Sequence, residues 1–244
     1  MELLRQNSIK IMKKLLLLIV CALATNFASA QVVSEKDFTN VFWDKYGMSP
    51  KNGKEWMRLA DSIVCDHPLD INRQITSTSI IDVEGKSKDE LYILANSWFV
   101  AQFNSGKDVI QMNDKEAGII IGKGHISNIG HRDGFSKSVD ISTWVIARID
   151  IKDNKVRLIT TIQEYEMEVK TGIGIALMGA GQQKIKDFSI MPDKAYPFDK
   201  ISHRAYNRET AMGYALGIAW CEVIKQKLQD ALRVGITGTD TLDW

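Results

Sequence analysis

Hydrophobic and polar residues alternate along the middle of the chain in a pattern that predicts a long β-strand. Between residues 139 and 151 every second position is apolar apart from one threonine, and most intervening positions are polar or charged. Successive side chains of a strand point to opposite faces, so this pattern predicts one buried and one exposed face. The predicted inward residues are Val139, Ile141, Thr143, Val145, Ala147, Ile149 and Ile151, and the outward residues are Asp140, Ser142, Trp144, Ile146, Arg148 and Asp150.

Neighbouring segments predict further strands in the same sheet. They are expected over residues 75–83, 109–112, 118–127 and 156–162, with a polar loop over residues 128–138. Asp153-Asn154-Lys155 predicts a tight turn between the last two strands. Because consecutive strands joined by short turns pair antiparallel, the sequence predicts an antiparallel meander.

A helix is predicted between the first two strands. Ser87 and Glu90 have the spacing of a capping box, in which each side chain accepts a hydrogen bond from the other residue's amide. The apolar residues that follow recur every three or four positions and predict one buried stripe. They are Leu91, Leu94, Ala95, Trp98, Phe99 and Phe103.

Helices are also predicted at both ends of the chain. One short helix is expected to begin at Ser34 and a second to cover residues 54–64. A long helix is expected over residues 207–233, where Gly213, Gly217 and Cys221 form a ridge of small side chains that permits close approach to the sheet. Charged residues within this helix exclude a membrane-spanning segment.

Together these elements predict an α+β fold. It has an antiparallel meander sheet, a capped helix after the first strand, a long C-terminal helix and two short N-terminal helices. Residues 31–74 are expected to form a helical extension and residues 75–233 the main domain, with an insertion or connector at 170–205. Residues 234–244 are expected to form a polar tail.

Residues 1–30 have the pattern of a secretory signal peptide. Lys13 and Lys14 precede an uninterrupted apolar run over residues 15–24, and Ala28-Ser29-Ala30 supplies small residues for cleavage after Ala30. The apolar run is about half of the roughly 20 residues that a spanning helix needs. The sequence therefore predicts a periplasmic or secreted protein that is not transmembrane, with either Met1 or Met12 as its start.

The charge balance argues against a nucleic-acid partner. The chain has 31 basic and 30 acidic residues. Residues 1–30 hold four of the basic and one of the acidic residues, so the remainder is net −2. A nucleic-acid module normally carries a basic excess gathered on one face.

Two cysteines remain after the leader, Cys65 and Cys221. An oxidising compartment permits a disulfide between them, which would tie the N-terminal extension to the last helix. The alternative is that both are small buried apolar residues.

The glycine-rich segment over residues 172–181 has three interpretations. It lacks the Gly-Lys-Ser/Thr ending of a phosphate-binding loop and does not fit Gly-x-Gly-x-x-Gly, so no nucleotide or other cofactor is predicted. A flap over the sheet edge, a small membrane-touching loop and a plain packed loop all remain open.

Two motifs carry a resemblance to a known family. They are Val83-x-Gly85-x-Ser87-Lys88-x-Glu90-Leu91-Tyr92-x-x-Ala95-x-x-Trp98-Phe99 and Asp114-Lys115-Glu116-Ala117-Gly118-x-x-Ile121-Gly122-Lys123-Gly124. The segment from Ile75 to Glu166 resembles an exported bacterial family, domain-of-unknown-function family 4468, with a TATA-binding-protein-like (TBP-like, helix-grip) fold of order β-α-β-β-β-β-α. The resemblance implies fold and export, and it implies no activity or catalytic residue.

His125 and His131 are the residues considered for catalysis or metal binding. They fall at the end of one predicted strand and in the loop after it, but no third ligand, His-Glu-x-x-His motif or Gly-x-Ser-x-Gly elbow accompanies them. No catalytic and no metal-binding residue is therefore predicted. A hydrolase or metal-dependent enzyme in this region is kept as an alternative.

The outward face of the predicted sheet is the candidate partner surface. Trp144 and Ile146 lie on it, Ile159 and Tyr165 are expected to join from the next strand, and Arg148 lies at the rim. Such an apolar patch with a charged rim is typical of a binding surface. The leading hypothesis is a noncatalytic envelope module that binds a protein partner or an apolar small ligand, on this face or between sheet and helix. A purely structural envelope component is a further alternative.

Overall fold

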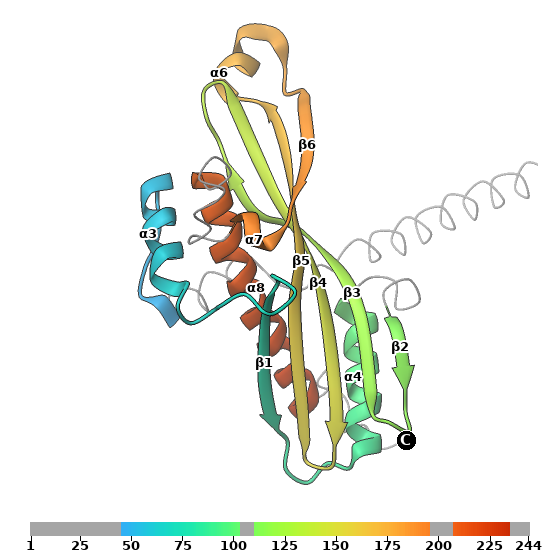
Figure 1. The fold of residues 1–244 in the computed structure, drawn as a ribbon. Helices are drawn as coiled ribbons and strands as arrows, with labels where there is room; N and C mark the ends of the chain where they lie inside the picture. The colour runs from blue at the N-terminus through green and yellow to red at the C-terminus, as the bar shows by residue number, and fades with distance from the viewer. Residues whose placement is uncertain (1–44, 103–109, 196–206, 235–244) are drawn as a thin grey trace, which may run out of the picture. The chain divides into compact units, whose positions relative to one another are not determined.

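A computed structural model of the chain describes residues 45–102, 110–195 and 207–234 (Figure 1). Within these residues the strands form one six-stranded antiparallel sheet in the order β1-β5-β4-β3-β2, and β6 pairs with the remaining part of β5. The strands are β1 (Ile75–Asp82), β2 (Ile110–Asp114), β3 (Ile119–Arg132), β4 (Lys137–Lys152), β5 (Lys155–Thr171) and β6 (Lys184–Ile190). The predicted α+β meander is confirmed.

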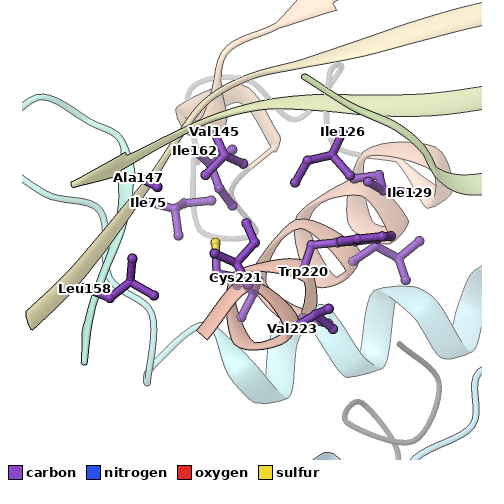
Figure 2. Packing of buried hydrophobic residues seen from close by; sticks show 14 of the residues in the cluster. Ile75, Ile126, Ile129, Val145, Ala147, Leu158, Ile162, Trp220, Cys221 and Val223 are labelled. Carbon is purple, nitrogen blue, oxygen red and sulfur yellow. The ribbon is translucent and has the colours of Figure 1, made fainter. Parts of the chain in front are cut away.

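Three longer helices accompany the sheet: α3 (Gly53–Ile63), α4 (Lys88–Gln102) and α8 (Arg208–Val234). Helix α8 packs against β1, β3, β4 and β5, and also against α3 and α4. Figure 2 shows Val145 and Ile162 of the sheet on the side of α8 to which Cys221 points, whereas Val223 lies on the side of α8 away from the sheet. We call the side of the sheet that packs against α8 the inner face and the opposite side the outer face.

Strand β4 follows the predicted alternation along its whole length. All seven predicted inward residues, from Val139 to Ile151, are buried. Those on the other side are only partly buried. Because the inner side chains join one continuous cluster with α8 and α4, this alternation fixes which face of the sheet carries the core.

Helix α4 begins with the predicted capping box. The Glu90 carboxylate accepts from the Ser87 amide at 2.8 Å, and the Ser87 hydroxyl accepts from the Glu90 amide at 3.3 Å. The predicted stripe is buried at Leu91, Ala95, Trp98 and Phe99. Phe103 lies outside the described residues.

Helix α8 approaches the sheet closely along the predicted ridge of small residues. A Cβ added to Gly213 would contact the Ile141 side chain at 3.4 Å. Cys221 is buried one turn beyond Gly217, near Thr160 of β5. Burial raises the pKa of the Cys221 thiol to about 11.

The disulfide that the sequence permits is not formed in this structure. Both cysteines are free: Cys65, just after α3, is exposed, whereas Cys221 is buried on the sheet side of α8.

Two irregularities in the strands also depart from the sequence predictions. Trp144 pairs with Glu164 and Val145 with Ile162, so Gln163 is an extra residue in β5 that reverses the alternation after it. A second bulge lets β3 run on to Arg132 where a loop was expected from residue 128. The loop between β3 and β4 is consequently only residues 133–136.

The predicted insertion is part of the sheet. After β5 come two short helical segments, α6 (Ile173–Ile175) and η2 (Ala176–Ala180), and then strand β6, which pairs with the far part of β5. A short helix, α7 (Pro192–Ala195), follows within the same predicted insertion or connector. Within the described residues the sheet therefore has one strand more than the sequence predicts.

The N-terminal extension is described only in its second half. Helix α3 packs against α8 and places Leu59, Ala60 and Ile63 in the main core. The leader over residues 1–30 lies outside the described residues. Most of the helix expected from Ser34 and of the polar tail lies outside them as well. Among the helices that are described, none has both the length and the apolar character needed to cross a membrane.

Candidate functional site

The outer face of the sheet brings together most of the residues that the sequence analysis selected. Register pairs Trp144 with His125, and Arg148 with both Ile121 and Ile159, all on the face away from α8. These side chains are partly exposed, because both long helices, α4 and α8, belong to the core on the inner face. The outer face is therefore the candidate binding surface.

Trp144 is held in a fixed orientation on this face. Its Nε1 donates to Glu166 Oε1 at 2.7 Å, and Glu166 Oε2 lies 2.9 Å from His125 Nε2. The His125 and Trp144 rings lie 4.8 Å apart at a tilt of 51°, and Lys123 Nζ lies 4.7 Å from the indole centroid. An indole fixed in this way loses little conformational freedom when a partner binds it.

His131 belongs to a second, separate network farther along β3. Its Nδ1 lies 2.5 Å from Asp140 Oδ1 and its Nε2 lies 3.0 Å from Asp133 Oδ2. The hydrogen bond to Asp140 is the largest cause that raises the pKa of His131, and the hydrogen bond to Asp133 raises it further. Lys170 donates to the other Asp140 oxygen at 2.6 Å, which raises the pKa of Lys170.

A third network lies at the opposite end of the face. Asp150 accepts from Arg148 Nε at 2.8 Å and from Arg157 Nε at 2.8 Å. Partial burial raises the pKa of Asp150, but the bonds from the two guanidiniums outweigh it and the net pKa is lowered. Ile146 lies between this network and Trp144, and Ile159 lies beside Arg148, so the face alternates fixed charges with apolar side chains.

A groove of about 620 Å³ opens between the outer face and β6. Its lining includes His125, Ser127, Asp140, Glu166, Lys170 and Phe188. Most of these side chains are polar or charged. The groove therefore suits a polar segment and does not resemble the apolar pocket that a hydrophobic small ligand needs.

Four of the five residues selected for the candidate partner surface lie on the outer face. Trp144, Ile146, Arg148 and Ile159 lie on the outer face. Tyr165 does not: it is fully buried in the core beneath α8. The bulge at Gln163 is the reason, because it turns Tyr165 to the face opposite the one that simple alternation assigns.

The two histidines share the outer face without forming a common site. Each binds its own carboxylates, Glu166 for His125 and Asp133 and Asp140 for His131. Within the described part of the chain, no group of three or more His, Cys, Asp or Glu side chains is arranged to hold a metal ion.

Glu166, Lys170 and Phe188 are the residues of this region that sequence reasoning missed. Glu164, Glu166 and Glu168 alternate along the sequence, which is a signal for one polar strand face. That signal could be placed on the outer face only once the bulge at Gln163 was known.

A family model with a TBP-like fold matches the central part of the chain. Residues 78–165 match the family model described as a domain of unknown function (DUF4468) with TBP-like fold. A TBP-like protein from Parabacteroides distasonis is 10% identical over 67% of this chain and 97% of its own, with a TM-score of 0.41. A DUF4468 family protein from Bacteroides ovatus is 12% identical over 80% of this chain and 100% of its own, with a TM-score of 0.44. None of the curated proteins matches the chain.

Proposed function

We propose, from the premise that this chain carries a DUF4468 domain with a TBP-like fold at residues 78–165, that it is a noncatalytic binding module of the bacterial envelope. Its binding surface is the outer face of the sheet and its ligand is a protein partner. The observation that carries the proposal is the unequal covering of the two faces. Helices α4 and α8 cover the inner face, whereas the outer face presents a fixed indole among isoleucines and paired charges.

The composition of the outer face favours a protein partner. Trp and Arg are enriched at the energetic centres of protein interfaces, and Trp144 and Arg148 here flank Ile146 on one strand. Glu166 already orients the Trp144 indole, and Asp150 already orients the Arg148 guanidinium. A partner that docks on this face would therefore lose little affinity to side-chain ordering.

The same face disfavours nucleic acid. Phosphate-binding surfaces collect lysine and arginine without nearby acids. Here the outward positions of β4 and β5 include five carboxylates, Asp140, Asp150, Glu164, Glu166 and Glu168. Their repulsion of phosphates offsets the attraction of Lys123 and Arg148.

The space between sheet and helix gives little support to the alternative of an apolar small ligand. Tyr165, Ile162 and Ile141 fill it directly against the glycine ridge of α8. Interiors packed in this way have little room for a ligand without rearrangement. The proposal therefore places binding on the surface.

Site-specific photo-crosslinking tests the proposal. A photoreactive residue replacing Ile146 is expected to give one discrete protein adduct in the producing cells. The matched control is Ile93, which is 60% exposed on the solvent side of α4. The proposal predicts no discrete adduct from position 93, and equal adducts from both positions, or none from 146, would contradict it.

A hydrolase is the second candidate because Ser127, His125 and Glu166 form a hydrogen-bonded chain. Ser127 Oγ lies 3.2 Å from His125 Nδ1, and His125 Nε2 lies 2.9 Å from Glu166 Oε2. This order of hydroxyl, imidazole and carboxylate is the one that activates a nucleophilic serine. However, residues two apart on one strand lie side by side without any catalytic reason, and Glu166 also holds Trp144.

A fluorophosphonate probe separates the two candidates. The binding proposal predicts no labelling that depends on Ser127. Labelling of the wild type that is lost in both Ser127→Ala and His125→Gln would favour the hydrolase and would contradict the noncatalytic proposal.

Location in the envelope is part of the proposal and is supported by the leader pattern over residues 1–30. Cleavage after Ala30 predicts that the mature protein begins at Gln31. N-terminal sequencing of the protein from the producing cells checks this, and an intact leader in every cell fraction would contradict it.

A further inference from the structure

Two connections meet at one end of the sheet and form a single tip. The first is the β3–β4 loop over residues 133–136, and the second is the β5–β6 connection over residues 172–183. Their backbones are joined: the amides of Gly172, Ile173 and Gly174 donate to the carbonyls of Ser136, Gly134 and Phe135 at 3.1 to 3.2 Å. Figure 1 shows this end, where α6 is labelled, extending past helices α3 and α8.

The tip exposes large apolar side chains. Leu177 is 84% exposed, Met178 77% and Phe135 68%, and Ile173 is also exposed. A Cβ added to Gly174 would clash with the Phe135 ring, so the two loops pack together while the outer side of the ring stays open. Apolar residues gathered in this way at one protruding end usually mark a contact with another apolar phase.

Charge is arranged around the tip in a specific order. Every residue from Thr171 to Gln183 is uncharged. Directly beneath it, Lys170 pairs in register with Lys184 across β5 and β6. On the neighbouring strands Lys137 lies opposite Thr171 and Lys186 lies opposite Val169. Four lysines therefore surround the base of the uncharged β5–β6 connection.

One acid, Asp133 of the β3–β4 loop, lies in the tip itself, where it accepts from Ser138 at 2.8 Å and lies 3.0 Å from His131 Nε2. The next acids along the strands lie behind the lysines. Asp140 accepts from Lys170 and Asp187 accepts from Lys184, and each lies farther from the tip along its strand than Lys137 and Lys184 respectively. Lys186 instead lies 5.0 Å from the Phe188 ring centroid. Apart from Asp133, which pairs with His131, an approaching surface would meet apolar side chains first, lysines second and carboxylates last.

We propose that this tip inserts into the interface of a phospholipid bilayer that contains anionic lipids. Phe135, Leu177 and Met178 would enter the boundary between headgroups and acyl chains, and the surrounding lysines would contact anionic headgroups. A bilayer fits better than a protein groove because the apolar residues protrude from one end and the basic residues surround them at three successive positions of β5. The inference is independent of the partner proposed for the outer face.

Vesicle sedimentation of the full chain purified from its producing cells tests the inference. Vesicles of phosphatidylcholine with about one-third phosphatidylglycerol are expected to carry the wild type into the pellet, and pure phosphatidylcholine to carry much less. The variant Leu177→Asp/Met178→Asp should bind the anionic vesicles weaker by on the order of tenfold or more. The variant Lys184→Ser/Lys186→Ser should lose the preference for anionic lipid.

The matched control is Ile71→Asp. Ile71 is 96% exposed in the turn between α3 and β1, away from the tip, so this variant should bind as the wild type does. All variants share the same N-terminus, so any contribution of the leader is common to them. Wild type that stays in the supernatant with both vesicle types overturns the inference, and so does a tip variant that binds like Ile71→Asp.

A second measurement, of fluorescence quenching, does not depend on whether the aspartate variants fold. Leu177→Trp places an indole at the tip, and vesicles with brominated acyl chains should quench its fluorescence beyond the quenching of the wild type. No additional quenching by the bound protein would overturn the inference even if binding is retained.

Discussion

The phenol of Tyr165 lies directly against the backbone of α8 at Gly217. A Cβ added to Gly217 would lie 2.8 Å from Tyr165 Oη and 2.9 Å from its Cε1. Tyr165 is fully buried, and its hydroxyl finds no hydrogen-bond partner within the described part of the chain. The bulge at Gln163 that turns this large ring inward is therefore accommodated by a glycine in the helix above it.

Gly217→Ala should destabilise the protein even though alanine is the better helix former. The steric overlap with Tyr165 is expected to cost about 1–3 kcal/mol, against a helix-propensity gain of at most about 1 kcal/mol. Gly213→Ala is the matched control, because its Cβ would meet Ile141 at an ordinary 3.4 Å. Urea unfolding should show a lower free energy of unfolding for position 217 and an unchanged or higher one for position 213. The reverse order would contradict the close packing.

Tyr165→Phe should leave the free energy of unfolding unchanged or raise it. The substitution keeps the buried ring and removes a hydroxyl that is unsatisfied in the core, which is the kind of deletion that costs little. Thermal and urea unfolding measure it. A loss of more than about 1.5 kcal/mol would mean that the hydroxyl makes a strong hydrogen bond.

His131 and His67 should titrate on opposite sides of the ordinary imidazole pKa of about 6.5. Hydrogen bonds to Asp140 and Asp133 raise the pKa of His131, whereas burial, together with Lys45, lowers the pKa of His67. His131 therefore stabilises the fold at low pH, and its contribution is lost as pH rises through the raised pKa. His67 stabilises at high pH, and its contribution is lost as pH falls through the lowered pKa.

Two-dimensional NMR of the imidazole protons checks this order, with His131→Gln and His67→Gln assigning the signals. Coincident titrations would contradict the two environments.

Ser87→Ala should destabilise helix α4 by about 0.5–2 kcal/mol, the usual range for a lost N-cap. Ser87 both accepts from the Glu90 amide and, through its own amide, donates to the Glu90 carboxylate. Ser87→Asp retains an acceptor and should retain most of the stability. Equal losses in the two variants, measured by urea unfolding, would argue against a capping role.

The regular parts of this fold could be predicted from the sequence, because a strand or helix with one buried face has apolar residues at regular intervals. Strand β4 alternates without interruption from Val139 to Ile151, and the α4 stripe follows a recognisable cap. Both signals are local. They fixed the sheet, its inner face and the position of Trp144 and Ile146 on the outer face.

What the sequence did not predict depends on irregular pairing. A bulge is one extra residue, and nothing in Gln163 distinguishes it from a regular strand residue, so Tyr165 was assigned to the wrong face. The bulge in β3 has a visible trace, since Asn128 adopts a positive φ of 55° that asparagine tolerates. Strand β6 gave no signal because six of its seven residues, from Lys184 to Ser189, are exposed.

The site could be predicted only in part for the same reason. Alternation placed single residues on the outer face, but the contacts between Trp144, Glu166 and His125 depend on the register of three strands. The sequence also could not show how α8 is oriented. The helix turns Cys221 toward Thr160 of the sheet and away from the surface, which bears on the possible disulfide.

Native mass spectrometry of the protein isolated from its own cell envelope in mild detergent tests the central claim most directly. Wild type and Ile146→Asp are compared, because Ile146 lies at the centre of the outer face and is not part of the folded core. The account predicts a second protein chain retained by the wild type and absent from the variant. A bare monomer in both spectra, or a partner retained equally by both proteins, would contradict it.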